Sequence, residues 1–209
     1  MKASIAGSLG LVLSIAGCAQ DAASYQTRLN QPLKKELEEI YARDQGVRQN
    51  ARAVVEKYGQ KSPQVDSLGR AMQRTDSLNL RRVTALIDRY GWLGKSLVGP
   101  DGSVTAFLVI QHSNLPTMQQ YAPMMRAAAA KGELEYASLA LVEDRILTYQ
   151  NKSQIYGSQL RTNPITGKME LFPIEDEAHV DERRAKMGLG ALTEYAQSFG
   201  LDYKPKKGR

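Results

Sequence analysis

Two long stretches of this chain repeat apolar residues at intervals of three and four, and no other feature of the sequence constrains its fold as strongly. In the first stretch the apolar positions are Leu33, Leu37, Ile40, Val47, Ala51, Val54 and Tyr58. In the second they are Val65, Leu68, Met72, Val83, Leu86 and Tyr90. This spacing places the apolar residues on one face of an α-helix. We therefore predict helices over 33–58 and 62–90, each preceded or opened by a proline.

Short polar side chains interrupt both apolar faces near their middle. Asp44 interrupts the first, and Arg48 lies one turn later at its edge. Asp76 and Asn79, three residues apart, interrupt the second. The first pair can be an ordinary helical ion pair worth roughly a few tenths of a kcal/mol, and all four side chains would be solvated if the helical phase differed by one position. A carboxylate on a core-facing stripe needs a partner, so we favour two antiparallel helices that set these polar patches opposite each other.

A continuous apolar run at 104–110 ends at Gln111 and His112. Its β-branched residues favour a strand, but its position between helices favours a buried helix, which is our prediction. A lone histidine at the end of such a run is either a structural residue or an acid–base group, and both interpretations stay open. Further helices are predicted over 115–131, 133–148, 180–186 and 189–199.

The stretch 144–159 carries more hydrogen-bonding side chains than a strand needs to fill a core. Its polar positions include Asp144, Arg145, Gln154, Tyr156, Ser158 and Gln159. A strong turn at 163–168 follows, and a second extended run closes what we predict to be a β-hairpin over about 153–174. The predicted fold is mainly α: a single multi-helix domain with one small β-hairpin.

The amino terminus resembles a bacterial lipoprotein signal. Met1–Lys2 is followed by an apolar run, 3–17, that is shorter than a membrane span of about 20 residues. It ends in Leu13-Ser14-Ile15-Ala16-Gly17-Cys18. The resemblance implies cleavage before Cys18, a diacylglycerol thioether on its sulfur and further acylation, for instance by palmitate. The alternative is an ordinary signal peptide, or an uncleaved amphipathic start, with an incidental cysteine.

The expected organisation follows from this leader. We predict a signal peptide at 1–17, a lipidated Cys18 with a polar tether at 18–30, a single helical domain at 31–200 and a basic tail at 201–209. Cys18 is the only cysteine, so the exported domain would carry no free thiol. The predicted location is the bacterial cell envelope, with the lipid anchor on the periplasmic side or in the outer membrane of a Gram-negative host.

The net charge of +6 comes mostly from the two ends of the chain. Five of the 28 basic residues lie there, which leaves 23 against 22 acidic residues. These five are Lys2, Lys204, Lys206, Lys207 and Arg209. No basic stripe interleaved with aromatic residues is present in the sequence, so we expect no nucleic-acid partner.

A series of short motifs in a fixed order is similar to a known family. The motifs are Asp44-Gln45 with Arg48, Asp76 with Asn79, Gly91-Trp92, Ser96-Leu97-Val98-Gly99, Gln111-His112, Asp144-Arg145, Gln154 with Tyr156-Gly157-Ser158-Gln159, Pro173-Ile174-Glu175-Asp176, Val180 to Arg184, Gly188-Leu189 and Glu194-Tyr195. Together they resemble the bacterial family catalogued as domain of unknown function 6624. The resemblance implies a mainly helical fold. It implies no catalytic residue, because the family's function is unknown.

Two functional hypotheses follow from the polar residues. In the first they line a pocket that binds a small ligand or acts like a hydrolase. His112 would be the general acid or base, and Asp44 or Asp144 would orient it. The candidate binding residues are Arg48, Asp76, Asn79, Gln111, Arg145, Gln154, Tyr156 and Gln159. In the second hypothesis the same residues form a buried network, and the protein is a non-catalytic envelope module that binds a protein or glycan partner.

No cofactor or metal site is predicted. The sequence contains no nucleophile elbow, phosphate-binding loop or zinc-ligand spacing. Three aspartates on three predicted helices are an alternative, since carboxylates bind hard cations such as Ca²⁺.

Overall fold

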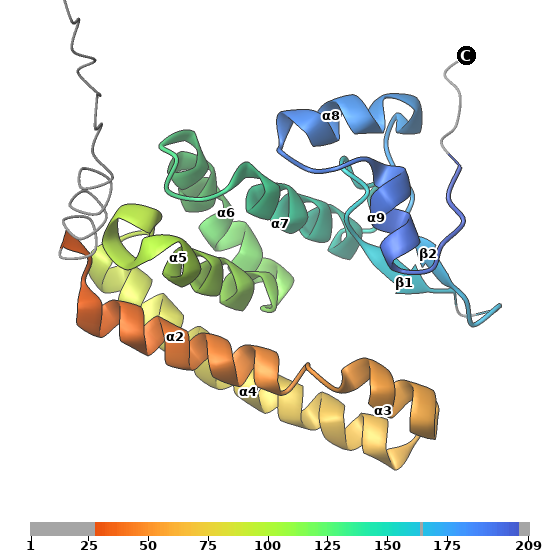
Figure 1. Cartoon of the computed structure of the whole chain (residues 1–209), viewed down its shortest axis with the longest axis horizontal. Helices are drawn as coiled ribbons and strands as arrows, with labels where there is room; N and C mark the ends of the chain where they lie inside the picture. The colour runs from red at the N-terminus through yellow and green to blue at the C-terminus, as the bar shows by residue number, and fades with distance from the viewer. Residues whose placement is uncertain (1–27, 164, 205–209) are drawn as a thin grey trace, which may run out of the picture.

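A computed structural model describes residues 28–163 and 165–204. These ranges contain eight α-helices, one 3₁₀ turn and one two-stranded antiparallel hairpin, which confirms the predicted mainly helical fold (Figure 1). The signal segment, Cys18 and most of the tether lie outside the described residues. Within those ranges, no helix combines the length and apolar character needed to cross a membrane.

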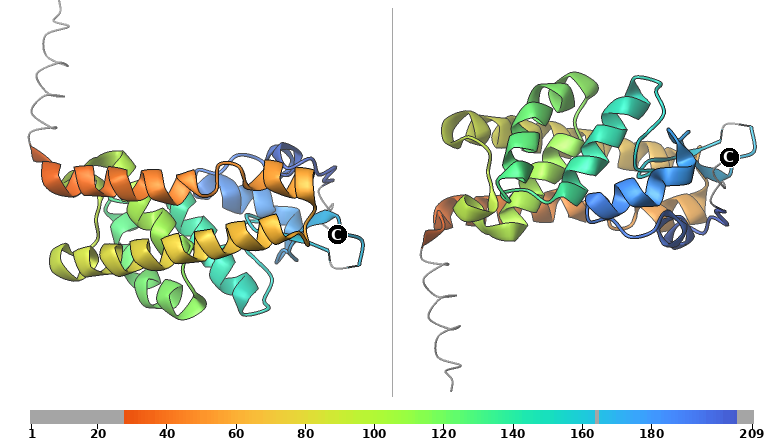
Figure 2. Two further views of the ribbon diagram at one scale, coloured as in Figure 1. Left: turned by 90° about the horizontal axis from the view of Figure 1, so that it is seen from below. Right: turned by 90° about the horizontal axis from the view of Figure 1, so that it is seen from above.

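The first layer consists of the two long helices predicted from the apolar spacing, together with a short one between them. These are α2 (Gln31–Gly46), α3 (Ala51–Tyr58) and α4 (Pro63–Tyr90). The side chain of Asn30 accepts the N–H of Leu33, and that of Ser62 accepts the N–H of Val65, so both long helices have side-chain caps. The chain reverses after α3, and α4 runs back alongside α2 (Figure 2).

The prediction of a single helix over 33–58 is wrong in one respect. The helix breaks between α2 and α3. The guanidinium of Arg48 turns back and donates to the backbone oxygen of Asp44 at 2.8 Å. The N–H of Arg48 bonds to the carbonyl of Gln45, three residues earlier, and the N–H of Gln49 makes the ordinary helical bond to the same carbonyl. The guanidinium of Arg48 thus satisfies the carbonyl of Asp44, to which the N–H of Arg48 would donate in a continuous helix.

The second layer contains α5 (Lys95–Gln111), α6 (Leu115–Ala130) and α7 (Tyr136–Tyr149). The run 104–110 lies within α5, so the helical interpretation is confirmed. Helix α5 packs on α2 and α4 on one side and on α6 and α7 on the other. It therefore lies at the centre of the core, whose fully buried residues include Leu37, Ile40, Val83, Val98, Ile110, Met118, Met125 and Val142.

The C-terminal part contains the hairpin and two short helices. Its elements are β1 (Leu160–Thr162), β2 (Met169–Leu171), a 3₁₀ turn (Glu177–His179), α8 (Val180–Lys186) and α9 (Leu192–Ser198). The hairpin pairs Leu160 with Leu171 and is shorter than the predicted range 153–174. Residues 155–159 form a loop, because Asp144 binds three of their N–H groups and leaves them unavailable for a strand ladder.

Candidate functional site

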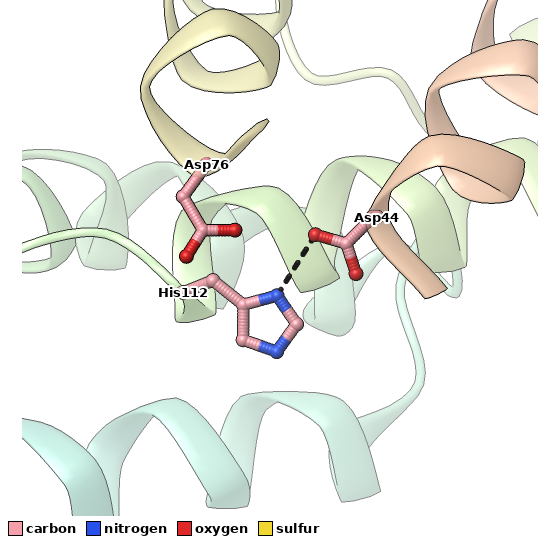
Figure 3. Close-up of side chains that lie close together, drawn as sticks. All are labelled: Asp44, Asp76 and His112. Atoms are coloured by element: carbon pink, nitrogen blue, oxygen red, sulfur yellow. Dashed lines mark hydrogen bonds and ion pairs between the residues drawn. The ribbon is translucent and has the colours of Figure 1, made fainter. Parts of the chain in front are cut away.

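Three helices bring two carboxylates and one imidazole together on one side of α5. Asp44 lies near the end of α2, Asp76 lies in the middle of α4, and His112 is the residue that caps the C-terminus of α5. One ligand atom from each lies within 4.8 Å of the others (Figure 3). We call Asp44, Arg48, Asp76 and His112 the three-helix cluster. The predicted meeting of polar patches from the two long helices is therefore observed, with His112 as a third contributor.

Asp44 is the buried centre of this cluster, with 1% of its surface exposed. Its Oδ1 lies 3.0 Å from Nδ1 of His112 and 3.2 Å from a nitrogen of Arg48, and Gln45 donates to its Oδ2 at 2.8 Å. Burial alone would raise the pKa of Asp44. The hydrogen bond and charge of His112, with the charge of Arg48, outweigh burial and leave this pKa below its ordinary value. Asp44 is therefore ionised at neutral pH.

The bond to Asp44 determines which nitrogen of His112 carries the proton. An ionised carboxylate can only accept, so Nδ1 must donate in the neutral ring, and Nε2 then carries the lone pair. Figure 3 shows this second ring nitrogen pointing away from both carboxylates. In the described part of the chain no hydrogen bond to Nε2 is found, and the atom is not fully buried. The side chain as a whole is 17% exposed.

Arg48 joins the two carboxylates of the cluster. Its second terminal nitrogen donates to Oδ1 of Asp76 at 2.6 Å, and its first bonds to Asp44. Asp44, Asp76 and His112 offer ligand types that suit a divalent cation. The guanidinium already supplies positive charge to both carboxylates. A surface cavity of about 410 Å³ lies beside Arg48. It is lined by Ala42, Gln45, Gly46, Arg48 and Gln49.

Asn79 lies one turn after Asp76 on α4 and is almost completely buried, at 1% exposure. Neither its amide nitrogen nor its amide oxygen has a hydrogen-bond partner among the described residues. An unpaired buried amide costs about 1–3 kcal/mol. Its burial shows that the second predicted interruption faces inward, as its position in the apolar stripe indicated.

Arg145 lies next to the three-helix cluster, on α7. Its Nη1 donates to the backbone oxygen of Gln111 at 2.9 Å, and its Nε donates to Oε1 of Gln159 at 3.0 Å. Gln111 directly precedes His112, so Arg145 links the histidine's segment to the loop that follows α7. Three predicted binding residues thus meet, although Gln111 contributes its backbone and not its side chain.

Asp144 has a different role from the one predicted. It is completely buried, and its carboxylate accepts the N–H groups of Ile155 at 2.7 Å, Tyr156 at 3.0 Å and Ser158 at 2.9 Å. Burial raises the pKa of Asp144, and the three N–H donors act against that rise. No bond joins it to His112 in the described residues. Asp144 is therefore an anchor for the loop and not the group that orients the imidazole.

Two other predicted binding residues belong to the same anchored loop. The side chain of Gln154 donates to the carbonyls of Gln159 and Phe172 and accepts the N–H of Gln159, so its amide is fully used inside the fold. The hydroxyl of Tyr156 donates to Glu143 at 3.3 Å. Burial, together with the charge of Glu143, raises the pKa of Tyr156 to about 12 and keeps its phenol protonated. In the described residues, neither side chain forms a hydrogen bond with a member of the three-helix cluster.

Sequence reasoning missed several residues that hold this arrangement together. The side-chain amide of Gln45 donates to Oδ2 of Asp44. Arg184, 2% exposed, donates to the carbonyls of Gly190 and Tyr156. The hydroxyl of Tyr195 donates to the carbonyl of Ser158 at 2.7 Å. All three lie in the motifs quoted above, and that was the only signal that could have found them.

Comparison with known proteins identifies the family but no function. The model of a family of unknown function, DUF6624, matches residues 31–206. The chain therefore belongs to this family. No curated protein and no solved structure shows a significant match.

Proposed function

We propose that this member of the family is a lipid-anchored protein of the bacterial cell envelope in which His112, oriented by Asp44, transfers protons to and from a small ligand, in the manner of a hydrolase. The observation that carries the proposal is the state of His112. A buried, ionised carboxylate holds Nδ1, while Nε2 forms no hydrogen bond among the described residues and belongs to a side chain that is 17% exposed.

The chemistry follows from that arrangement. Nε2 accepts a proton from a water molecule or a ligand hydroxyl and becomes the second N–H of an imidazolium. The negative charge of Asp44 stabilises this cation, and the same nitrogen later returns the proton to a leaving group. Arg48 keeps Asp44 ionised and joins it to Asp76, so the carboxylate is held in place while the ring changes charge.

The proposed anchor rests on the leader alone. Cys18 follows small and aliphatic residues, and acyl chains on one cysteine anchor a protein stably, since each buried methylene contributes about 0.8 kcal/mol. The test is the membrane fraction of cells that express Cys18→Ser. We expect the variant to leave that fraction, and a variant that stays membrane-bound without lipid would contradict the proposal.

The test of the acid–base role uses two histidines with the same partner type. His112→Asn keeps a donor near the position of Nδ1 and removes Nε2, so the contact with Asp44 can persist. His179→Asn is the control, because His179 also bonds an aspartate, Asp176, but is exposed and distant in sequence. In a panel of small carboxylic and phosphoric esters, we expect turnover to fall by about 10²–10⁴-fold in His112→Asn only, with the melting temperature preserved.

A second candidate function has an observation of its own. Asp44, Asp76 and Asn79 are at least half buried between helices, and the amide of Asn79 faces no polar partner in the described ranges. In this alternative the network is purely structural, and it holds α2, α4 and α5 together in a non-catalytic envelope module. Under that alternative, the parent protein turns over no ester of the panel, and His112→Asn lowers the melting temperature because it removes a member of the network. Ester turnover that is lost in His112→Asn at an unchanged melting temperature favours the acid–base role.

A further inference from the structure

We infer that Arg145 is the subsite for an anionic group, a carboxylate or a phosphate, on the ligand that His112 handles. This inference rests on the proposed function and names the class of ligand. The inference starts from the guanidinium of Arg145, which is largely buried and has no carboxylate partner among the described residues.

Arg145 lacks the counter-charge that the other inward-facing arginines have. Arg48 bonds two aspartates directly. Arg184 lies over the ring of Tyr195 and within the field of Asp181 and Asp144. Arg145 forms no ion pair with any described carboxylate, and its two hydrogen bonds go to neutral oxygens. Burial lowers the pKa of Arg145, and the like charge of Arg48 acts in the same direction.

The guanidinium also has unused donors. Of its five N–H groups, one on Nε and one on Nη1 are bonded. In the described residues no hydrogen bond is found for Nη2, and this atom is not fully buried. Two N–H groups on Nη2 and the second N–H on Nη1 therefore remain to donate to the oxygens of a carboxylate or phosphate.

The guanidinium of Arg145 is held in a fixed position by two bonds, and one of them goes to the residue that precedes the proposed catalytic group. One bond of Arg145 goes to the carbonyl of Gln111, the residue before His112. The other goes to Gln159, whose own amide is fixed by Leu141 and Ser158. Such a fixed donor needs little reordering when a ligand binds. Arg48 adds a second positive charge close enough to act on Arg145. An anionic group at Arg145 would thus present the rest of the ligand to His112.

The experiment titrates inorganic phosphate and, separately, acetate into the full chain in detergent micelles, followed by calorimetry. Arg145→Gln removes the charge, and Arg145→Lys keeps the charge but not the two-pronged edge. Arg126→Gln is the matched control, because Arg126 is exposed and already paired with Glu143. We expect saturable binding that weakens by about tenfold or more in Arg145→Gln, less in Arg145→Lys and not in the control. Preference for phosphate or acetate identifies the anion.

The result also separates this inference from the proposed function. Binding that survives in His112→Asn and is lost in Arg145→Gln supports the subsite even if ester turnover is never found. If Arg145→Gln does not fold, the comparison of Arg145→Lys with the parent takes its place, and weaker binding supports the subsite. Equal binding by the parent and the folded Arg145 variants, or no saturable binding of either anion, overturns it.

Discussion

Asp44 is the residue on which the three-helix cluster depends. It is nearly inaccessible, yet it is charged, because three donors from different directions compensate for its burial. Removal of one member of a buried, hydrogen-bonded charge group usually costs about 3–5 kcal/mol, since its partners lose their compensation. Arg48 retains Asp76 as a partner, so the cost should lie toward the lower end of this range.

The depressed pKa of Asp44 leads us to expect a specific dependence of stability on pH. The folded pKa of Asp44 is depressed below the unfolded value of about 3.9. Its contribution is therefore fully present above that value and is lost as pH falls through the lower, folded pKa. We expect Asp44→Asn to reduce the free energy of unfolding by about 3 kcal/mol at neutral pH and to flatten the acid limb of the stability profile.

The measurement is urea denaturation from neutral pH to about pH 2. Asp202→Asn is the control, because Asp202 is exposed near the end of the described residues. An acid limb in Asp44→Asn as steep as that of the parent would show that Asp44 is not the group that titrates.

The residues of the cluster could be identified from the sequence, but their contacts could not. Asp44, Asp76 and Asn79 were visible because each occupies a position that the helical period assigns to an apolar residue. Asp144 was visible as the start of a stretch rich in hydrogen-bonding side chains, and the structure shows that its carboxylate anchors three backbone N–H groups. The spacing of apolar residues can locate a buried carboxylate. It does not show whether that carboxylate anchors a loop or pairs with a histidine.

At the level of elements, the close contact between α5 and α2 positions His112 against Asp44. A Cβ atom on Gly102 would lie 2.7 Å from the side chain of Val98 and 3.3 Å from Cδ1 of Leu37 on α2. The shortest contact is with Val98 inside α5, and Leu37 would have to move by a few tenths of an ångström, so a methyl group fits poorly at this position. We expect Gly102→Ala to destabilise the protein by about 1–3 kcal/mol and to loosen the bond between Asp44 and His112.

A second glycine provides the control for this prediction. Gly69 lies inside α4, is exposed, and would place a Cβ where no atom lies within 4 Å. Gly69→Ala should stabilise the protein by about 0.5–1 kcal/mol through helix propensity alone. Thermal unfolding of both variants is the measurement. Equal effects in the two variants would mean that the packing of α5 on α2 is not tight at Gly102.

The elements themselves were mostly predictable, and the exceptions have physical causes. The helical period located α4, α6 and α7 to within a few residues, because their apolar faces contact the core directly. The break after α2 was not visible, since it depends on Arg48 turning back onto Asp44. The loop at 155–159 looked like a strand because its polar residues alternate, while a single distant carboxylate determines its conformation.

At the scale of the whole molecule, the polar residues fall into two groups with different roles. One group, the three-helix cluster, lies between α2, α4 and α5. The other, around Asp144, joins α7 to the hairpin, α8 and α9 through backbone contacts that Arg183, Arg184 and Tyr195 extend. Arg145 connects the two. The sequence indicated one polar centre, and the fold separates it into a candidate site and a structural joint.

The most direct test of the central claim is ¹⁵N NMR of the ring nitrogens of His112, with His179 assigned beside it. We expect the neutral ring of His112 to carry its proton on Nδ1 and to leave Nε2 unprotonated, and we expect Asp44→Asn to lose this preference. A neutral ring protonated mainly on Nε2 would contradict a base held by Asp44.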